Sequence, residues 1–482
     1  MAHLISRQAR QRREFLRQCA AISLLGSGAG AMNGKLGLIG SAIAASSDYA
    51  ALDDYKALVC VFLYGGSDSF SMFVPTDDDR YQQYANSRGG LAVPKESLLT
   101  GTTDTGIGFN PLLSNLHGMY DTGSLALFSN VGNLISPTTR AQFQAGGSTV
   151  PNDLFAHNHQ QEQWLKGLSS SPAAVVGSGW GGRMADLLQY ANQSDGLPSS
   201  FSVAGSNYWL PGEQVQPIAL SPVYGLSPLQ YLDGAAGITS SNARGNTLDA
   251  MLSMGSSNPL KQQAATSLAR AKSGAAQLKA TLQANRDFDT PYDNRSKLAT
   301  QLRMVARLIA GNQQLGMRRQ IFFVGAGGWD THDNQTPRLN ALLTDLDRSM
   351  FDFQNTLTEI NLADSVTTFS ASDFGRTLTI NGDGSDHGWG GHYMVMGGAV
   401  NGGRMLGQLP SLAVGSDDDT GDKGRIIPSL SINQYGALMA RWMGVTDSDL
   451  NGIFPDLANF GSSWDAGMRD VFCSSSNAAC DS

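Results

Sequence analysis

Three apolar runs in this 482-residue chain each lead into a short polar segment that contains an aspartate. The runs are 57–64 (ALVCVFLY), 320–325 (QIFFVG) and 365–370 (SVTTFS), and the aspartates are Asp68, Asp330 and Asp373. Short apolar runs bounded by glycine and polar residues are typical of buried strands. Open α/β sheets place their sites just beyond the carboxyl ends of such strands. The pattern therefore predicts an α/β fold with three carboxylates at one edge of the sheet.

Helical patterns alternate with these strands along the chain. We expect helices near 159–167, after Gly179, and over 259–285, 295–319 and 337–360, with a further strand over 125–131. Alternation of strand, helix and strand implies parallel strands joined by crossover helices. The expected fold is a mostly parallel sheet sandwiched by helices. We expect a single domain over 45–465, an insertion at 205–290 and a C-terminal tail at 466–482.

The first 44 residues have the features of an export signal in the expected order. Paired arginines at 12–13 precede a glycine- and alanine-rich apolar segment that ends in the small-residue cleavage site AIA at 42–44. These features are typical of a twin-arginine signal peptide. Asn33 and Lys35 interrupt the apolar segment, whereas a bilayer-spanning helix needs about 20 apolar residues. We expect release into the periplasm or beyond, with no transmembrane anchor after processing.

The charge of the processed chain argues against nucleic acid as a partner. Removing 1–44 takes six Lys/Arg from 33 and one Glu from 41 Asp/Glu, which leaves 27 basic against 40 acidic residues. The resulting net charge of −13 repels a phosphate backbone. The oligomeric state stays open.

The cysteines predict at most one disulfide in the processed chain. Cys60 lies inside the first apolar run and is expected in the core. Cys473 and Cys480 flank a short polar loop and can pair in an oxidising compartment.

Histidines accompany the strand-end aspartates. Asp330 and His332 stand one residue apart in GGWDTH, and DHGWGGH at 386–392 adds two imidazoles in a glycine-rich loop. Imidazole and carboxylate donors suit Zn, Mn or Fe, and sites richer in oxygen suit Mg or Ca. An Asp-Thr-His triplet alone is also typical of a helix N-cap with a satisfied histidine. The repeated strand-end placement favours a divalent metal site of Zn, Mn, Mg or Ca, with the candidate ligands Asp68, Asp330, His332, Asp373, His387 and His392.

Two further residues are candidates for catalysis. Arg376 follows the strand-end Asp373, and its planar guanidinium can clamp an anionic group. A salt bridge between Arg376 and Asp373 is the alternative. His157 is the second candidate, in the segment that leads into a predicted helix.

Two oxygen-rich segments are expected to have no metal. The segment 381–386 has aspartate where a calcium loop has its glycine, so a turn is expected. The acidic segment 417–422 is expected to be a solvated loop. No phosphate-binding glycine motif follows a strand, so nucleotide cofactors are not indicated.

Ordered sequence blocks from about Lys56 to Phe460 resemble a family of exported bacterial proteins known as domain of unknown function 1501. The blocks include GGSDSFSMFVP, HNHQQEQWLKG, GWGGRMAD, GGWDTHDNQ and SASDFGRTLTINGDGSDHGWGGH. That family is similar to the alkaline phosphatase/sulfatase-like superfamily. The resemblance implies an alkaline phosphatase-like core with a loop and helix insertion. It also implies a two-metal site at the carboxyl edge of the sheet, with a Ser or Thr nucleophile at a helix N-terminus.

The resemblance also implies roles for single residues. By motif, Asp68 corresponds to the first-strand aspartate ligand, and Asp330 with His332 to ligands of a second metal. Asp373 corresponds to the aspartate of a Ser-Asp-His-Gly block, and His387 or His392 to a late histidine.

Two positions depart from the superfamily pattern. Phe374 stands where the block has histidine, and Ala156 stands before His157 where related chains have serine. An alanine cannot act as a nucleophile. Two functions therefore stay open. One is a metal-dependent hydrolase of phosphate or sulfate esters, whose implied partner is a small-molecule or polymer ester substrate. The other is a catalytically silent periplasmic binding or assembly protein that keeps the fold.

Overall fold

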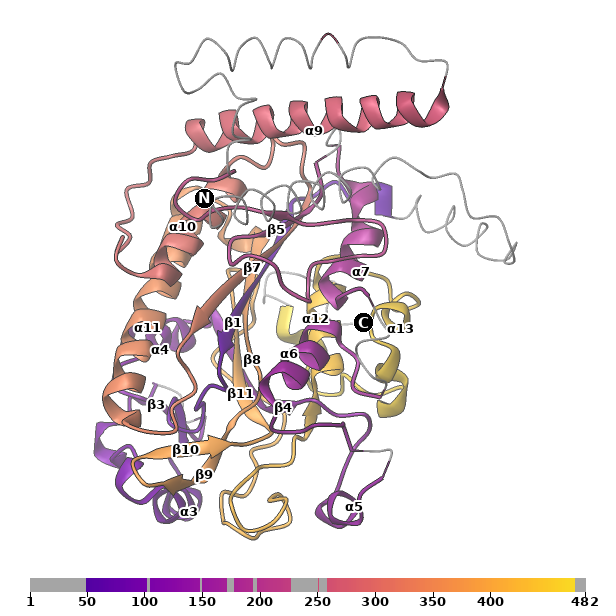
Figure 1. The fold of residues 1–482 in the computed structure, drawn as a ribbon. Helices are drawn as coiled ribbons and strands as arrows, with labels where there is room; N and C mark the ends of the chain where they lie inside the picture. Colours follow the sequence, from indigo (N-terminus) through magenta and orange to yellow (C-terminus); the bar gives the residue numbers. More distant parts are fainter. Residues whose placement is uncertain are drawn as a thin grey trace, which may run out of the picture.

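The computed structural model describes residues 49–101, 105–147, 150–170, 177–193, 197–226, 250 and 258–472 (Figure 1). The predicted signal at 1–44 and the cysteines Cys473 and Cys480 lie outside the described residues. Among the described helices, none is long and apolar enough to cross a membrane.

A nine-stranded sheet forms the centre of the molecule (Figure 1). The strand order is β12-β4-β11-β8-β1-β7-β5-β6, and β13 also pairs with β4. Among these described strands, every pairing is parallel except the two that β11 makes with β4 and β8. The predicted mostly parallel α/β sheet is therefore confirmed. The strands are β1 (Lys56–Tyr64), β4 (Leu125–Gly132), β5 (Ser200–Ser202), β6 (Ile218–Ala219), β7 (Arg319–Gly327), β8 (Val366–Ser372), β11 (Gly391–Met396), β12 (Met405–Leu406) and β13 (Leu430–Ser431).

The central strand β1 is buried on both faces. Val59 and Val61 join the core on one face, whereas Cys60 and Phe62 join the core on the other. A strand with helices over both faces needs apolar side chains at every position, because neither face contacts water. This double burial explains the continuous apolar run at 57–64 and confirms Cys60 as a core residue.

Helices cover the two faces of the sheet (Figure 1). One layer contains α4 (Ser114–Asp121), α10 (Lys297–Ala310) and α11 (Gln335–Glu359), with α9 (Pro259–Ala284) beside α10. The other contains α6 (His157–Lys166), α7 (Trp180–Leu188), α12 (Ile432–Trp442) and α13 (Leu450–Ile453). The predicted sandwich of a sheet between helices is confirmed.

One predicted helix is shorter than expected. The helix expected over 295–319 ends at Ala310, and turns lead from Gly311 to β7. Gly311 has φ −90° and ψ 12°, and a Cβ atom there would lie 2.1 Å from the Thr281 side chain, so close packing explains the glycine at this helix end. Apolar residues such as Leu315 and Met317 follow the helix and are buried, so the sequence pattern extends beyond Ala310 although the helix does not.

Two small antiparallel pairs lie outside the main sheet. One consists of β9 (Arg376–Asn381) and β10 (Gly384–His387), joined by a turn at 382–383, and this confirms the turn predicted for 381–386. The other consists of β2 (Phe73–Pro75) and β3 (Ile107–Phe109), near α3 (Asp78–Arg88). In Figure 1 the β9–β10 hairpin and α3 lie together below the main sheet, with α5 (Arg140–Ala145) at the same end.

The acidic segment 417–422 differs from the prediction at one residue. Asp419 is fully buried, and its carboxylate accepts hydrogen bonds from the backbone N–H groups of Gly415, Gly421, Gly424 and Arg425. Four donors compensate the charge that burial removes from water. Asp419 therefore organises the loop from within, and the prediction of a solvated loop is wrong there.

The predicted insertion at 205–290 is described only in part, since 227–249 and 251–257 lie outside the described residues. Its first part contributes β6 to the sheet edge, and Trp209 is fully buried in the core. The domain bounds stay predictions.

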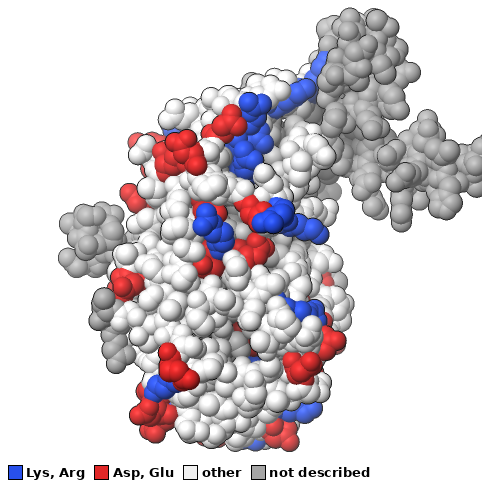
Figure 2. Space-filling model, turned by 90° about the vertical axis from the view of Figure 1, so that its left-hand side faces the viewer, with Lys and Arg blue, Asp and Glu red and all other residues white. Residues whose placement is uncertain are grey.

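Charged side chains are scattered over one large face of the molecule. Figure 2 shows small groups of acidic and basic residues separated by uncharged surface. Among the described residues visible there, no broad area has a single sign. That face therefore produces no extended field of the kind that steers a polyanion.

Candidate metal centre

The loops after β7 and β8 meet on either side of the loop after β1. In the parallel register, Tyr64 lies beside Gly327 and Leu63 beside Ser372, so the three strands end together. The Gly65 N–H donates a hydrogen bond of 3.2 Å to Asp373 Oδ1. A Cβ atom at Gly65 would lie 2.4 Å from the backbone nitrogen of Asp330. Only glycine permits this approach of the three loops.

Three imidazoles converge on one carboxylate beside this junction. Asp330 Oδ2 lies 3.5 Å from His157 Nε2, and Asp330 Oδ1 lies 3.0 Å from His332 Nε2 and 3.3 Å from His387 Nε2. We call His157, Asp330, His332 and His387 the Asp330 cluster. Within it, His157, Asp330 and His387 each offer a ligand atom within 4.8 Å of the others.

Each imidazole of the Asp330 cluster is anchored through Nδ1. His157 Nδ1 lies 2.7 Å from Asp373 Oδ2, His332 Nδ1 lies 3.1 Å from Asp386 Oδ1, and His387 Nδ1 lies 2.7 Å from the Phe155 carbonyl. These oxygens accept hydrogen bonds, so each Nδ1 carries the proton. The Nε2 lone pairs are therefore directed toward the cluster, as in metal sites whose histidines are oriented by a second hydrogen bond.

The donor set fits a divalent cation. Nε2 of His332 and Nε2 of His387 lie only 2.8 Å apart, although the Nδ1 anchors leave a lone pair on each. A positive charge at the cluster, either a cation on Asp330 and His387 or a proton on one of the two rings, offsets that repulsion. Ligands about 2.0–2.1 Å from one ion are separated by about 3.3 Å in a tetrahedral arrangement. The separations from Asp330 of 3.0–3.5 Å are close to that value.

Electrostatics favour the ligand forms of two members. Burial by itself raises the pKa of Asp330, but the hydrogen bond and charge of Arg376 outweigh burial and hold that pKa below its usual value. Burial lowers the pKa of His387, which favours the neutral imidazole. The hydrogen bond that His157 donates to Asp373 raises the pKa of His157, which favours the protonated ring until a cation displaces the proton from Nε2. An ionised carboxylate and a neutral imidazole are the forms that bind metals.

Arg376 supports Asp330 instead of facing solvent. Its side chain is fully buried, and Nη1 donates 2.6 Å to Asp330 Oδ1 and 3.3 Å to the Gly65 carbonyl. Nε and Nη2 contact Ser385 Oγ and the Ser385 carbonyl. The salt bridge expected as the alternative thus forms with Asp330 and not with Asp373. This placement is unsuited to the predicted anion clamp.

Two predicted ligands lie outside the Asp330 cluster. Asp68 is buried in an ion pair with Arg88 and accepts hydrogen bonds from Ser71 Oγ at 2.7 Å and Gln335 Nε2 at 2.6 Å. His392 is buried against Phe70, and its Nδ1 accepts 3.2 Å from the Asn130 N–H. Burial lowers the pKa of His392 to about 3. Both side chains are therefore buried and paired within the protein, and neither contributes a ligand atom to the Asp330 cluster.

The placement of His157 and Asp373 also differs from the sequence interpretation. His157, expected as a catalytic residue, contributes a ligand atom at the first position of α6. Asp373, expected as a ligand, receives His157 Nδ1 and the Gln161 amide at 2.8 Å. Asp373 therefore orients a ligand. No spacing in the sequence links His157 to Asp330, because α6 reaches the cluster only through packing.

The two departures from the superfamily pattern both lie beside the Asp330 cluster. The Phe374 ring centre lies 4.9 Å from that of His157 and 4.6 Å from that of His387. The Phe374 ring therefore occupies the space on one side of the Asp330 cluster and offers no ligand atom there. Ala156 is the N-cap of α6 and offers no hydroxyl.

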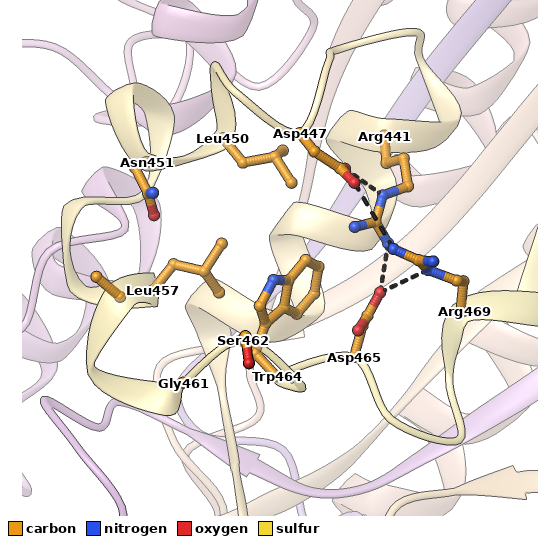
Figure 3. Close-up of a pocket in the computed structure, with 11 residues that line it drawn as sticks. Arg441, Asp447, Leu450, Asn451, Leu457, Gly461, Ser462, Trp464, Asp465 and Arg469 are labelled. Atoms are coloured by element: carbon orange, nitrogen blue, oxygen red, sulfur yellow. Dashed lines mark hydrogen bonds and ion pairs between the residues drawn. The ribbon is translucent and has the colours of Figure 1, made fainter.

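A separate hollow of about 360 Å³ lies near the C-terminal end of the described chain (Figure 3). Its charged residues pair with one another, because Arg441 binds Asp447 and Asp465, each at 2.8 Å, and Arg469 binds Asp465 at 3.0 Å. In Figure 3 these pairs lie on one side of Trp464, with Leu457 on the other. None of the predicted site residues lines this hollow.

Comparisons with known proteins identify a family. A search of curated proteins finds no match. A crystal structure of the PsFucS1 sulfatase from Pseudoalteromonas sp. is similar at a TM-score of 0.34 and 8% identity, over 86% of this chain and 73% of that one. The model of a family described as protein of unknown function (DUF1501) matches residues 55–421. Since that match spans more than half of the sequence, the chain belongs to the DUF1501 family.

Proposed function

We propose that the Asp330 cluster holds one divalent cation and that the exported protein hydrolyses phosphate or sulfate esters with it. The observation that carries the proposal is the common orientation of three imidazoles. Each is anchored at Nδ1 and directs Nε2 toward Asp330. The ester class comes from the resemblance of the sequence blocks to the alkaline phosphatase/sulfatase-like superfamily. Imidazole with carboxylate favours Zn or Mn over Mg or Ca, which prefer oxygen ligands.

The residues of the Asp330 cluster and their neighbours have different roles in this proposal. His157, Asp330 and His387 would hold the cation, which supplies a Lewis acid that polarises an ester oxygen and neutralises the transferring group. Arg376 keeps Asp330 ionised, and Asp373 orients His157.

Water is the nucleophile that fits this site. Ala156 at the N-cap of α6 cannot attack the ester. The His332 side chain is 41% exposed, and its Nε2 faces the cluster while Asp386 holds Nδ1. We assign to His332 the role of accepting the proton from the attacking water at Nε2.

A single cation per chain follows from Phe374. A second ion needs further donor atoms, but the Phe374 ring lies against both His157 and His387. Asp68 is already neutralised by Arg88. The two-metal centre implied by the superfamily is therefore not what we propose.

The alternative function is a catalytically silent binding or assembly protein. Ala156 and Phe374 favour it, because each replaces a group that related hydrolases use. Such a protein would keep the cation for stability alone, since binding to the folded state raises the free energy of unfolding.

Metal content and turnover of matched variants test the proposal. We expect the purified protein to contain about one Zn or Mn per chain and to hydrolyse an aryl phosphate or aryl sulfate. Asp330→Asn is expected to lower metal affinity at least about 10-fold and to abolish turnover, because a central ligand loses its charge. His159→Gln is the control, since His159 lies on the same helix but pairs with Asp153 at 3.1 Å.

The outcomes separate the two functions. Metal binding with no turnover on either ester, together with a cation-dependent melting temperature, supports the silent protein. Turnover that survives both chelation and Asp330→Asn contradicts the proposed metal centre.

A further inference from the structure

Arg425 lies next to the Asp330 cluster and belongs to none of its contacts described so far. Its Nε donates 3.1 Å to the backbone carbonyl of His387. Its guanidinium carbon lies 4.2 Å from the ring centre of Phe155, a cation–π arrangement. Because Phe155 also accepts the hydrogen bond from His387 Nδ1, Arg425 contacts the ligand residue His387 directly through its backbone and indirectly through Phe155.

The terminal nitrogens of Arg425 have no acceptor among the described residues. No hydrogen bond from Nη1 or Nη2 and no carboxylate within ion-pair distance is found for this half-buried side chain in the described ranges. Arg376, by contrast, uses Nε and both Nη atoms within the protein. Arg425 therefore presents two parallel donors and an uncompensated positive charge beside the site.

The backbone holds Arg425 in place. Its N–H donates 3.1 Å to the buried Asp419 carboxylate, and its carbonyl accepts 3.1 Å from the Thr420 N–H. Arg140 ties the same loop through the carbonyls of Gly415 and Gly421. A donor held in advance loses less conformational entropy when it binds a ligand.

Phe155 itself has an unusual conformation. Its φ is 73°, in the left-handed region that bulky residues rarely adopt. Such a conformation costs free energy, and it is found where function requires a particular direction of the chain. Here it lets one residue direct its carbonyl to His387 and place its ring beneath Arg425.

We propose that Arg425 binds the anionic oxygens of the substrate's phosphate or sulfate group. A guanidinium recognises a tetrahedral oxyanion through two parallel N–H donors, which lysine cannot reproduce. Arg425 thus supplies the anion clamp that the sequence predicted for Arg376. The inference rests on the proposed function for the ester that carries the anion. The anion contact itself can be measured without turnover.

Calorimetry with inorganic phosphate and inorganic sulfate tests the clamp on the protein loaded with Zn. We expect Arg425→Met to weaken binding of at least one anion about 10-fold or more, since hydrogen bonds to a charged group are lost. Arg425→Lys should bind with intermediate affinity, because lysine keeps the positive charge but lacks the planar pair of N–H donors. Lys423→Met is the control, since it removes an exposed positive charge from the same loop. It should change the affinity less than about twofold.

Metal analysis of the same samples distinguishes this inference from the proposed function. Unchanged metal content in Arg425→Met, with weaker anion binding and a raised KM for the ester, supports the clamp. Arg425-dependent anion binding in a protein that holds no metal also supports it, while contradicting the proposed hydrolase. Equal anion binding by wild type and Arg425→Met overturns the clamp, as does the absence of binding to the loaded wild type.

Discussion

The three imidazoles of the Asp330 cluster differ in what holds them. Carboxylates hold His157 and His332, whereas a backbone carbonyl holds His387. A carboxylate partner makes an imidazole a stronger base and a stronger ligand, and a carbonyl fixes its orientation without adding charge. The cluster therefore combines two electron-rich rings with one neutral ring, which limits the net negative charge gathered around a single ion.

The burial of His392 predicts a loss of stability in acid. Burial lowers the pKa of His392 to about 3 in the folded protein, against an ordinary value of 6.5. Between these two pH values the unfolded chain binds a proton at His392 and the folded protein does not. Neutral His392 therefore contributes its full share to the free energy of unfolding above pH 6.5. This share is lost as the pH falls from 6.5 toward the pKa of His392 in the folded protein. Between about pH 7 and pH 5 the loss is about 2 kcal/mol.

Urea unfolding of the metal-free protein at both pH values measures this effect. His392→Gln keeps a hydrogen-bond acceptor but has no group that titrates in this range. We expect the variant to be less stable at neutral pH and to lose about 2 kcal/mol less than wild type on acidification. Equal losses in the two proteins would show that His392 is charged in the folded state.

Sequence reasoning found some site residues and not others for a physical reason. Asp330 follows the apolar run of β7, so its place at the sheet edge could be predicted. His387 was found from the glycine-rich segment 386–392, although it lies at the end of β10 and not in a loop after an apolar strand. The true partners of Asp68 and Arg376 could not be predicted, because each pair forms between segments with no shared spacing. Asp68 pairs with Arg88, and Arg376 with Asp330.

At the scale of elements, strands were easier to predict than their directions. The runs behind β1, β7 and β8 are apolar because both faces of each strand are covered. β11 is likewise buried along its whole length, but it runs antiparallel between β4 and β8. Side-chain alternation is identical in the two directions, so orientation depends on the connections and the packing of the whole sheet.

The β9–β10 hairpin is held against the loop after β7 by a glycine. A Cβ atom at Gly384 would lie 2.2 Å from the backbone of His332. Gly384→Ala is therefore expected to push His387 away from His332 and to lower metal affinity about 10-fold or more, together with the melting temperature. Gly327→Ala is the control, since no atom lies within 4 Å of the added methyl. Metal titration followed by thermal unfolding checks both, and equal affinities would show that the hairpin does not position His387.

At the scale of the whole molecule, the export prediction rests on residues 1–44, which lie outside the described residues. Replacing both Arg12 and Arg13 with lysine is expected to leave the precursor in the cytoplasm, because a planar guanidinium pair is not reproduced by ammonium groups. Arg7→Lys with Arg10→Lys is the control, since it makes the same change just ahead of the pair. Cell fractionation measures the outcome, and equal periplasmic yields of the two double variants would contradict a twin-arginine signal.

The position of β1 in the sheet has a consequence for synthesis. It is the first described strand, yet both of its neighbours come more than 250 residues later, since Lys56 lies beside Arg319 and Ala57 beside Val366. A ribosome therefore releases an entirely apolar segment long before its partners exist. Contacts so distant along the chain slow folding and leave such segments open to aggregation. We expect the nascent chain to depend on chaperones until β8 has emerged, and denatured protein to refold slowly and in low yield.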